Sequence, residues 1–259
     1  MNFLIKSGQG LKGEITIPGD KSISHRSIIL SSLAEGTSKI HGLLEGEDCL
    51  ATIEVFRNMG IKIINEEGIY SIEGNGLRGL DAPQKPLDFG NSGTSIRLCS
   101  GILSAQNFQS TLVGDSSLSS RPMQRIVEPL TDMGAKITSN NGTLPLNISP
   151  TDSLKSIDYL LPVASAQVKS CIMLAALYAE GVTKIEERAV TRDHTENMLK
   201  QFGIPVNVEN SDGKKRISLG NINSINPTDI IICGDFSSAA FFILAGLICP
   251  ESELLIKNV

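Results

Sequence analysis

The chain has 259 residues, of which 41% are hydrophobic and 20% charged, with a formal net charge of −5. This is the composition of a globular protein with one or two domains, and its acidic balance argues against a nucleic-acid surface. No apolar run approaches the roughly 20 residues that cross a bilayer, and residues 1–7 are too short for a secretory signal, so we expect a cytoplasmic protein without membrane or nucleic-acid partners.

The five cysteines are widely spaced, with apolar neighbours and no C-x-x-C pair. We expect buried thiols rather than disulfides or zinc ligands. The cysteines therefore predict no metal site, and we also expect no cofactor.

The first informative element is a helix that begins within residues 19–26 (GDKSISHR). A strand-like run at 14–17 ends at Pro18, and apolar residues at helical spacing continue to position 34. Lys21, Ser22 and Arg26 thus lie where a helix presents unpaired N–H groups, which favours an anion such as a phosphate. The same residues also fit an ordinary capped surface helix.

Further along, an amphipathic helix followed by a glycine and a short strand occurs three times, at 51–63, 124–137 and 195–206. Gly60, Gly134 and Gly203 are each placed as a helix C-cap, separated by 74 and 69 positions. The repeating unit is therefore about 70 residues long.

Each unit also opens with a polar helix start that leads into an apolar helix, at 22–34, 91–103 and 165–177. Strand-like residues 36–40 (GTSKI) are echoed by 181–185 (GVTKI). Alternation of this kind predicts an α/β fold of the α+β type, with repeated units of helices packed on mixed β-sheets.

A fourth unit begins at 234–240, continues with a helix at 241–247 and a strand at 254–256, and stops at Val259 before its second helix. The sequence therefore predicts three complete units plus part of a fourth, and we expect the natural protein to be longer. The apolar faces of Phe241, Phe242, Ile243 and Leu247 are then expected to be exposed.

Five motifs occur in order: 19–26 (GDKSISHR), 91–97 (NSGTSIR), 119–123 (SSRPM), 165–170 (SAQVKS) and 192–196 (RDHTE). Together they resemble the 5-enolpyruvylshikimate-3-phosphate synthase family over essentially the whole chain. The resemblance implies the inside-out α/β barrel of the enolpyruvyl transferases, which has six units. It also implies a complete three-unit domain at 19–231 that binds shikimate 3-phosphate, while 1–18 and 232–259 belong to an incomplete second domain.

The reaction implied by the resemblance is transfer of the enolpyruvyl group of phosphoenolpyruvate to the 5-hydroxyl of shikimate 3-phosphate, with release of phosphate, by a monomer of the aromatic amino-acid pathway. The family is also the target of glyphosate, and Gly93 lacks the methyl group that crowds this inhibitor in tolerant members. The residues that match shikimate 3-phosphate contacts are Lys21, Ser22, Arg26, Ser165, Ala166, Gln167 and Arg192. Those that match phosphoenolpyruvate contacts are Lys21, Asn91, Gly93, Thr94, Arg121 and Gln167, and Lys21 is the one that carries a catalytic role.

The family's proton-acceptor aspartate and the remainder of its phosphoenolpyruvate pocket lie beyond Val259, so we expect this chain alone to be inactive. Taken singly, each motif also fits an ordinary turn or cap. We expect packing roles for His25, His194, Arg97, Lys169 and Asp193, and a solvated edge for Glu186 and Glu187.

Two other functions remain open from the residues. A sister enolpyruvyl transferase acts on UDP-N-acetylglucosamine with a reactive cysteine loop, but the comparable stretch here, 119–122, holds no cysteine. The second alternative is a non-catalytic fragment that binds phosphate.

Overall fold

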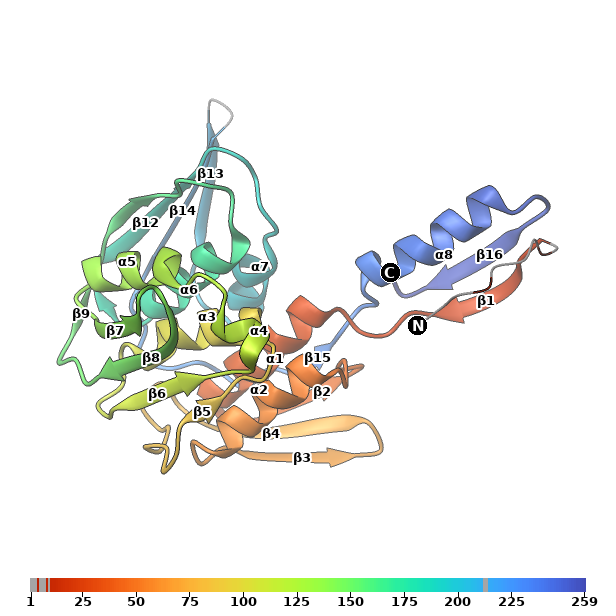
Figure 1. Cartoon of the computed structure of the whole chain (residues 1–259). Helices are drawn as coiled ribbons and strands as arrows, with labels where there is room; N and C mark the ends of the chain where they lie inside the picture. The colour runs from red at the N-terminus through yellow and green to blue at the C-terminus, as the bar shows by residue number, and fades with distance from the viewer. Residues whose placement is uncertain (1–3, 5–7, 9, 212–213) are drawn as a thin grey trace.

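The computed structural model describes residues 4, 8, 10–211 and 214–259. Figure 1 shows a large body of helices and sheets, and a small body of β1, α8 and β16 that stands apart from it. The expected second domain includes residues 1–3, 5–7 and 9, which lie outside the described residues.

Three four-stranded sheets of the same topology form the large body. In each sheet the first two strands are parallel and the other pairs antiparallel. The orders are β15 (Ile230–Ile231), β2 (Glu35–His41), β4 (Ile69–Asn75), β3 (Lys62–Glu66); β5 (Leu87–Asp88), β6 (Ser110–Val113), β8 (Thr143–Ser149), β7 (Lys136–Asn140); and β10 (Asp158–Leu160), β12 (Val182–Glu187), β14 (Lys214–Gly220), β13 (Asn207–Ser211). A short parallel pair joins β9 (Leu154–Lys155) to β11 (Ala179–Glu180).

Three helices, α1 (Lys21–Leu33), α3 (Gly93–Leu103) and α6 (Ala166–Ala176), form the inner layer. Nearly all their residues are buried, because serine, alanine and glycine cover the sides on which helices approach each other. A methyl group on Gly101, for example, would overlap the carbonyl oxygen of Cys171 on α6. The predicted polar starts at 22, 91 and 165 therefore lead into helices that cross the interior.

A second helix in each unit is amphipathic: α2 (Glu47–Arg57), α5 (Gln124–Asp132) and α7 (His194–Gln201). Each is followed by its predicted glycine, and Gly60, Gly134 and Gly203 have φ values of 84°, 95° and 78°, which side chains disfavour. The short α4 (Ser116–Ser119) precedes α5. The three-unit repeat, and with it the α/β class of helices packed on mixed sheets, is confirmed; the sheets of the described residues remain separate, without a closed barrel.

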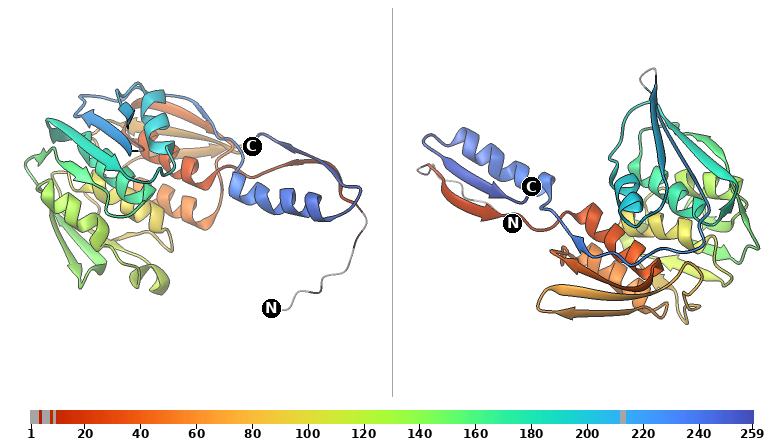
Figure 2. Two further views of the ribbon diagram at one scale, coloured as in Figure 1. Left: turned by 90° about the horizontal axis from the view of Figure 1, so that it is seen from above. Right: turned by 180° about the vertical axis from the view of Figure 1, so that it is seen from behind.

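The small body pairs β1 (Lys12–Thr16) in parallel with β16 (Glu253–Lys257), and α8 (Phe236–Ile248) packs beside them. Figure 2 shows that two chain segments connect it to the large body. These segments lie side by side: the Asp20 amide donates to the Cys233 carbonyl at 2.8 Å, and the Asp235 amide donates to the Pro18 carbonyl at 2.9 Å. We call these two connecting segments the crossings, and these hydrogen bonds join them at one point.

Two observations concern surface exposure. The predicted exposure of the apolar α8 face is confirmed, with Phe241 77% and Leu247 79% exposed. The expectation of five buried thiols is wrong for two: Cys233 is exposed in a crossing segment and Cys249 is partly exposed after α8. In the described part of the chain, no helix is long and apolar enough to cross a membrane.

Candidate functional site: three converging helix starts

The first turns of α1, α3 and α6 lie at one end of the large body. Side chains at matched depth in the three helices contact one another: Gln167 Nε2 donates to Thr94 Oγ1 at 3.0 Å, one residue into each helix, and Arg26 Nη2 donates to Ser170 Oγ at 2.8 Å. Because α3 and α6 contact each other at their starts and again further along, at Gly101 and Cys171, these helices run in the same direction. Their N-termini, where unpaired N–H groups carry partial positive charge, are therefore brought together.

At the start of α1, Asp20 Oδ1 caps the helix by accepting the Ile23 amide at 2.8 Å. Lys21 follows at once, with its side chain 48% exposed and its Nζ 2.5 Å from Asp48 Oδ2 at the start of α2. Ser22 is half-buried, and its carbonyl accepts Arg26 Nη1 at 2.8 Å. Lys21 is thus the exposed cation at this helix start, oriented by one carboxylate.

Arg26 is buried one turn deeper and connects three helices. Besides its bond to Ser170 on α6, its Nε donates to Thr195 Oγ1 on α7 at 2.6 Å. Burial lowers the pKa of Arg26 to about 10, with a smaller lowering from the nearby Arg192 guanidinium. Arg26 therefore remains a cation at neutral pH, and Arg192, exposed in the loop before α7, lies close enough to repel it.

At the start of α3, Ser92 caps the helix by accepting the Ser95 amide at 3.2 Å. Arg121 Nη2 donates to Asn91 Oδ1, so two predicted residues from different motifs are in contact. A methyl group on Gly93 would lie 2.9 Å from Arg97 Nη1 and 3.0 Å from Arg121 Nη1. Glycine at this position leaves the space that the two guanidinium groups occupy.

Arg97 was expected to have a packing role, and the structure gives it a more specific one. Its Nη1 donates to Gln167 Oε1 at 2.7 Å and to the Gly93 carbonyl at 3.1 Å, and its Nη2 donates to the Pro122 carbonyl at 3.1 Å. Burial, followed by repulsion from Arg125 and Arg121, lowers its pKa to about 10. Arg97 thereby orients Gln167, whose other amide atom reaches Thr94. The available signal in the sequence is its position one helical turn after Gly93.

The start of α6 completes the arrangement. Ser165 caps it by accepting the Val168 amide at 3.4 Å, and Ser165, Ala166 and Gln167 are all half-buried. The first amides of α6 thus face the same end of the molecule as Lys21 and Thr94. All eleven predicted site residues belong to the three helix starts or to the two segments, 121–123 and 188–193, beside them.

Neither histidine in these motifs is placed as a base. His25 is buried, its Nδ1 lies 2.8 Å from Thr52 Oγ1, and burial lowers its pKa to about 4. Burial also lowers the pKa of the half-buried His194. Both imidazoles are therefore weaker bases than a free histidine side chain, which agrees with the packing roles expected for them.

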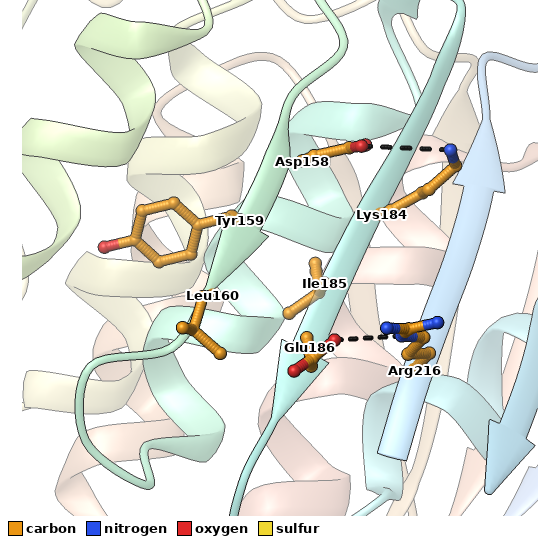
Figure 3. Close-up of a pocket in the computed structure, with 7 residues that line it drawn as sticks. All are labelled: Asp158, Tyr159, Leu160, Lys184, Ile185, Glu186 and Arg216. Atoms are coloured by element: carbon orange, nitrogen blue, oxygen red, sulfur yellow. Dashed lines mark hydrogen bonds and ion pairs between the residues drawn. The ribbon is translucent and has the colours of Figure 1, made fainter. Parts of the chain in front are cut away.

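A shallow hollow of about 420 Å³ lies elsewhere, on the solvent side of the third sheet. Figure 3 shows its side chains paired across strands, with Asp158 opposite Lys184 and Glu186 opposite Arg216. None of the eleven predicted residues lines this hollow. The charges of this hollow are neutralised by one another. The helix starts gather five cations, Lys21, Arg26, Arg97, Arg121 and Arg192, of which only Lys21 forms a salt bridge within the described residues. We therefore take the helix starts as the candidate site.

The family model described as "EPSP synthase (3-phosphoshikimate 1-carboxyvinyltransferase)" matches residues 5–259. The chain is 50% identical to the 3-phosphoshikimate 1-carboxyvinyltransferase of Hydrogenovibrio crunogenus, over all of this chain and 59% of that protein, and 54% identical to that of Ruthia magnifica, over 99% and 58%. A solved EPSP synthase from Acinetobacter baumannii superposes with a TM-score of 0.90 at 49% identity, over 98% of this chain and 57% of that one. The chain thus spans less than three fifths of the length of these relatives.

Proposed function

The chain belongs to the EPSP synthase family, and from this premise we propose that its converging helix starts bind shikimate 3-phosphate as part of an enzyme that transfers the enolpyruvyl group of phosphoenolpyruvate to it. The single observation that carries the proposal is the contact between the starts of α1, α3 and α6: Arg26 bonds to Ser170, and Gln167 bonds to both Thr94 and Arg97. Helix N-termini and fixed cations that face one place are suited to a multiply charged anion.

The phosphate of shikimate 3-phosphate is assigned to the side of the site between α1 and α6. Arg26, Ser22 and Arg192 lie at one edge, and Ser165 with the Ala166 amide lies at the other. In the free chain Arg192 repels Arg26, and an anion between them would relieve this repulsion. Binding would therefore be strongest for a doubly charged phosphate.

Phosphoenolpyruvate is assigned to the α3 side, where Asn91, Thr94 and Arg121 surround Gly93. Lys21 and Gln167 lie between the two assigned places, which suits contact with both substrates. Transfer forms a bond between the 5-hydroxyl oxygen and the enolpyruvyl carbon that carries the phosphate, and it breaks the bond from that carbon to the phosphate oxygen. The hydroxyl proton leaves with the released phosphate, and Lys21 near the departing charge would stabilise the transition state.

The domain assignment is likewise a proposal. We assign residues 19–231 to the substrate-binding domain, and 1–18 with 232–259 to a second domain, because the two joined crossings lie at these boundaries. A cytoplasmic location and a monomeric state of the whole enzyme remain predictions. Because no catalytic aspartate is assigned within this chain, we expect it to bind shikimate 3-phosphate without turnover.

Calorimetric titration of the 259-residue chain with shikimate 3-phosphate tests the proposal. Arg192→Gln should weaken binding by about tenfold, the effect of roughly 1.4 kcal/mol from one charge-assisted contact. Arg188→Gln removes the same charge from an exposed position of the same loop and should leave the affinity unchanged.

Titration with UDP-N-acetylglucosamine separates the proposal from the sister transferase. Binding of that nucleotide sugar in place of shikimate 3-phosphate, or equal losses in the two arginine variants, would contradict the proposal.

A further inference from the structure

Four charged side chains that the proposed function does not use form a buried cluster behind the site. Lys169 on α6 is fully buried, and its Nζ lies 3.1 Å from Glu187 Oε2 and 2.8 Å from Glu196 Oε1. Lys215 Nζ lies 3.0 Å from the same Glu196 oxygen. We call Lys169, Glu187, Glu196 and Lys215 the buried ion network; it joins α6, β12, α7 and β14.

The burial of Glu187 corrects the expectation of a solvated edge at 186–187. Strand β12 alternates its side chains, so Glu186 faces solvent while Glu187 faces the interior with Thr183 and Ile185. The network holds two positive and two negative charges, which compensate one another away from water. Because buried ion pairs add little net stability, their presence here calls for another explanation.

The network reaches the site by two routes. On the first, Thr191 Oγ1 donates to Glu187 Oε1 at 2.5 Å, which ties the loop that carries Arg192 to the network. On the second, Glu196 and Lys169 each adjoin a residue that contacts the Arg26 guanidinium: Thr195 accepts from Nε, and Ser170 accepts from Nη2. Thr195 and Ser170 also lie 2.6 Å apart, oxygen to oxygen.

Consecutive helical residues point about 100° apart, so each helix directs one residue into the network and its neighbour toward Arg26. The ion pairs fix the relative placement of α6 and α7. This placement acts on Arg26 through Thr195 and Ser170, and on Arg192 through Thr191. Two like charges that repel each other need such constraints if they are to face one anion.

We propose that the buried ion network is a positioning device, which holds Arg192 through Thr191 and Arg26 through Thr195 in the orientation that binds the anion. Lys169, Glu187 and Thr191 are accordingly positioning residues, and none of them touches the substrate. The proposal deepens the proposed function and rests on it for the identity of the anion, shikimate 3-phosphate.

Thr191→Val is the most informative variant, because it removes the hydrogen bond from the loop to Glu187 while leaving every ion pair in place. Loss of one hydrogen bond of this kind is worth roughly 1 kcal/mol, so affinity for shikimate 3-phosphate should fall about fivefold. Hydrogen exchange of amides 188–193, read by mass spectrometry, should accelerate, and the melting temperature should change little. Thr191→Ser keeps the hydroxyl and should restore both affinity and protection.

Thr183→Val is the matched control. Thr183 lies on the same face of β12, is fully buried, and has no hydrogen-bond partner for its hydroxyl among the described residues. The same substitution there should change neither affinity nor exchange at 188–193.

The outcomes separate the two proposals. If the wild-type chain binds shikimate 3-phosphate and Thr191→Val binds equally well with unchanged exchange, the positioning role is wrong and the proposed function stands. If the wild-type chain does not bind, the proposed function of this chain is wrong. Faster exchange in Thr191→Val without weaker binding would also overturn the positioning role. In that case Thr191 would hold the loop in the wild-type chain, but the hold would not affect binding of the anion.

Discussion

Arg97 and His25 are the buried polar residues that join the helices just below the site. Arg97 bonds across α3 and α6, and His25 Nδ1 contacts Thr52 Oγ1, which in turn donates to Ser95 Oγ at 2.8 Å. Buried polar groups are costly unless they are hydrogen-bonded, so the bonds that Arg97 and His25 make favour one arrangement of the helices. Among the described residues, His25 Nε2 and Arg97 Nε have no partner. The orientation of Gln167 in the site follows from this arrangement.

The lowered pKa of His25 predicts acid sensitivity. Its pKa falls from 6.5 to about 4 on folding, so the unfolded chain binds one more proton than the folded chain between these values. The free energy of unfolding should therefore decrease as the pH falls from about 6.5 towards 4, by roughly 3 kcal/mol in total. Urea unfolding at pH 7, 6 and 5 measures this slope.

His25→Gln should flatten the pH dependence, whatever its effect on stability at pH 7. His194→Gln is the control, because His194 is only half-buried and its pKa shift, though in the same direction, is smaller. An equal slope in wild type and His25→Gln would show that the neutral histidine is not the cause.

At the scale of elements, the close approach of α3 and α6 determines where the helix starts lie. Gly101 on α3 packs against the backbone of α6 at Cys171, and these two helices share the Thr94, Arg97 and Gln167 bonds at their starts. Any increase in the distance between the helices would separate these side chains. Tight packing of two glycine- and alanine-containing helices is thus part of the site's construction.

Gly101→Ala should accordingly destabilise the protein by several kcal/mol, roughly 3, because the added methyl overlaps α6 backbone and cannot move aside. Gly246→Ala is the matched substitution inside α8, where the methyl would be at an ordinary 3.4 Å from Leu254 Cδ1. That change should raise local helix stability by about 0.5–1 kcal/mol. Chemical denaturation of both variants checks the opposite signs, and equal effects would contradict the packing argument.

In the whole molecule, the two joined crossings connect two bodies that differ in how much of their apolar surface is buried. The large body has an extensive buried core, whereas α8 in the small body buries only Ala239 among its own residues. A large exposed apolar surface of this kind is unfavourable in water. The contact between the crossings, at Pro18, Asp20, Cys233 and Asp235, sets where that surface is held.

We therefore predict that this chain self-associates through α8 as its concentration rises. The double variant Phe241→Lys with Leu247→Lys should remain monomeric in sedimentation velocity runs at concentrations where wild type associates. Leu50→Lys replaces an exposed leucine of α2 in the large body and should leave association unchanged. Association that persists in the double variant would place the contact elsewhere.

Much of the fold was predictable because its signals are local. Three signals each depend on a few neighbouring residues: the glycines at 60, 134 and 203, the polar starts at 22, 91 and 165, and the apolar periodicity between them. The helices and the three-unit repeat follow from these signals. The candidate residues of the site came from the family motifs that the chain resembles, and the structure places each of them at or beside a helix start.

What the tertiary structure alone decided concerns residues distant in sequence. The pairing of β15 with β2 completes the first sheet and joins residues about 190 positions apart in the sequence. No local sequence pattern predicts this pairing. Glu187, taken from the sequence as solvated, is buried because Lys169 and Thr191 fold against it; Cys233, taken as buried, is exposed because it lies in a crossing. Arg97 acquires its bond to Gln167 only when α3 and α6 pack together. Local propensity thus determined the elements and their starts, while burial and pairing, which depend on contacts between remote segments, were decided by the packed chain.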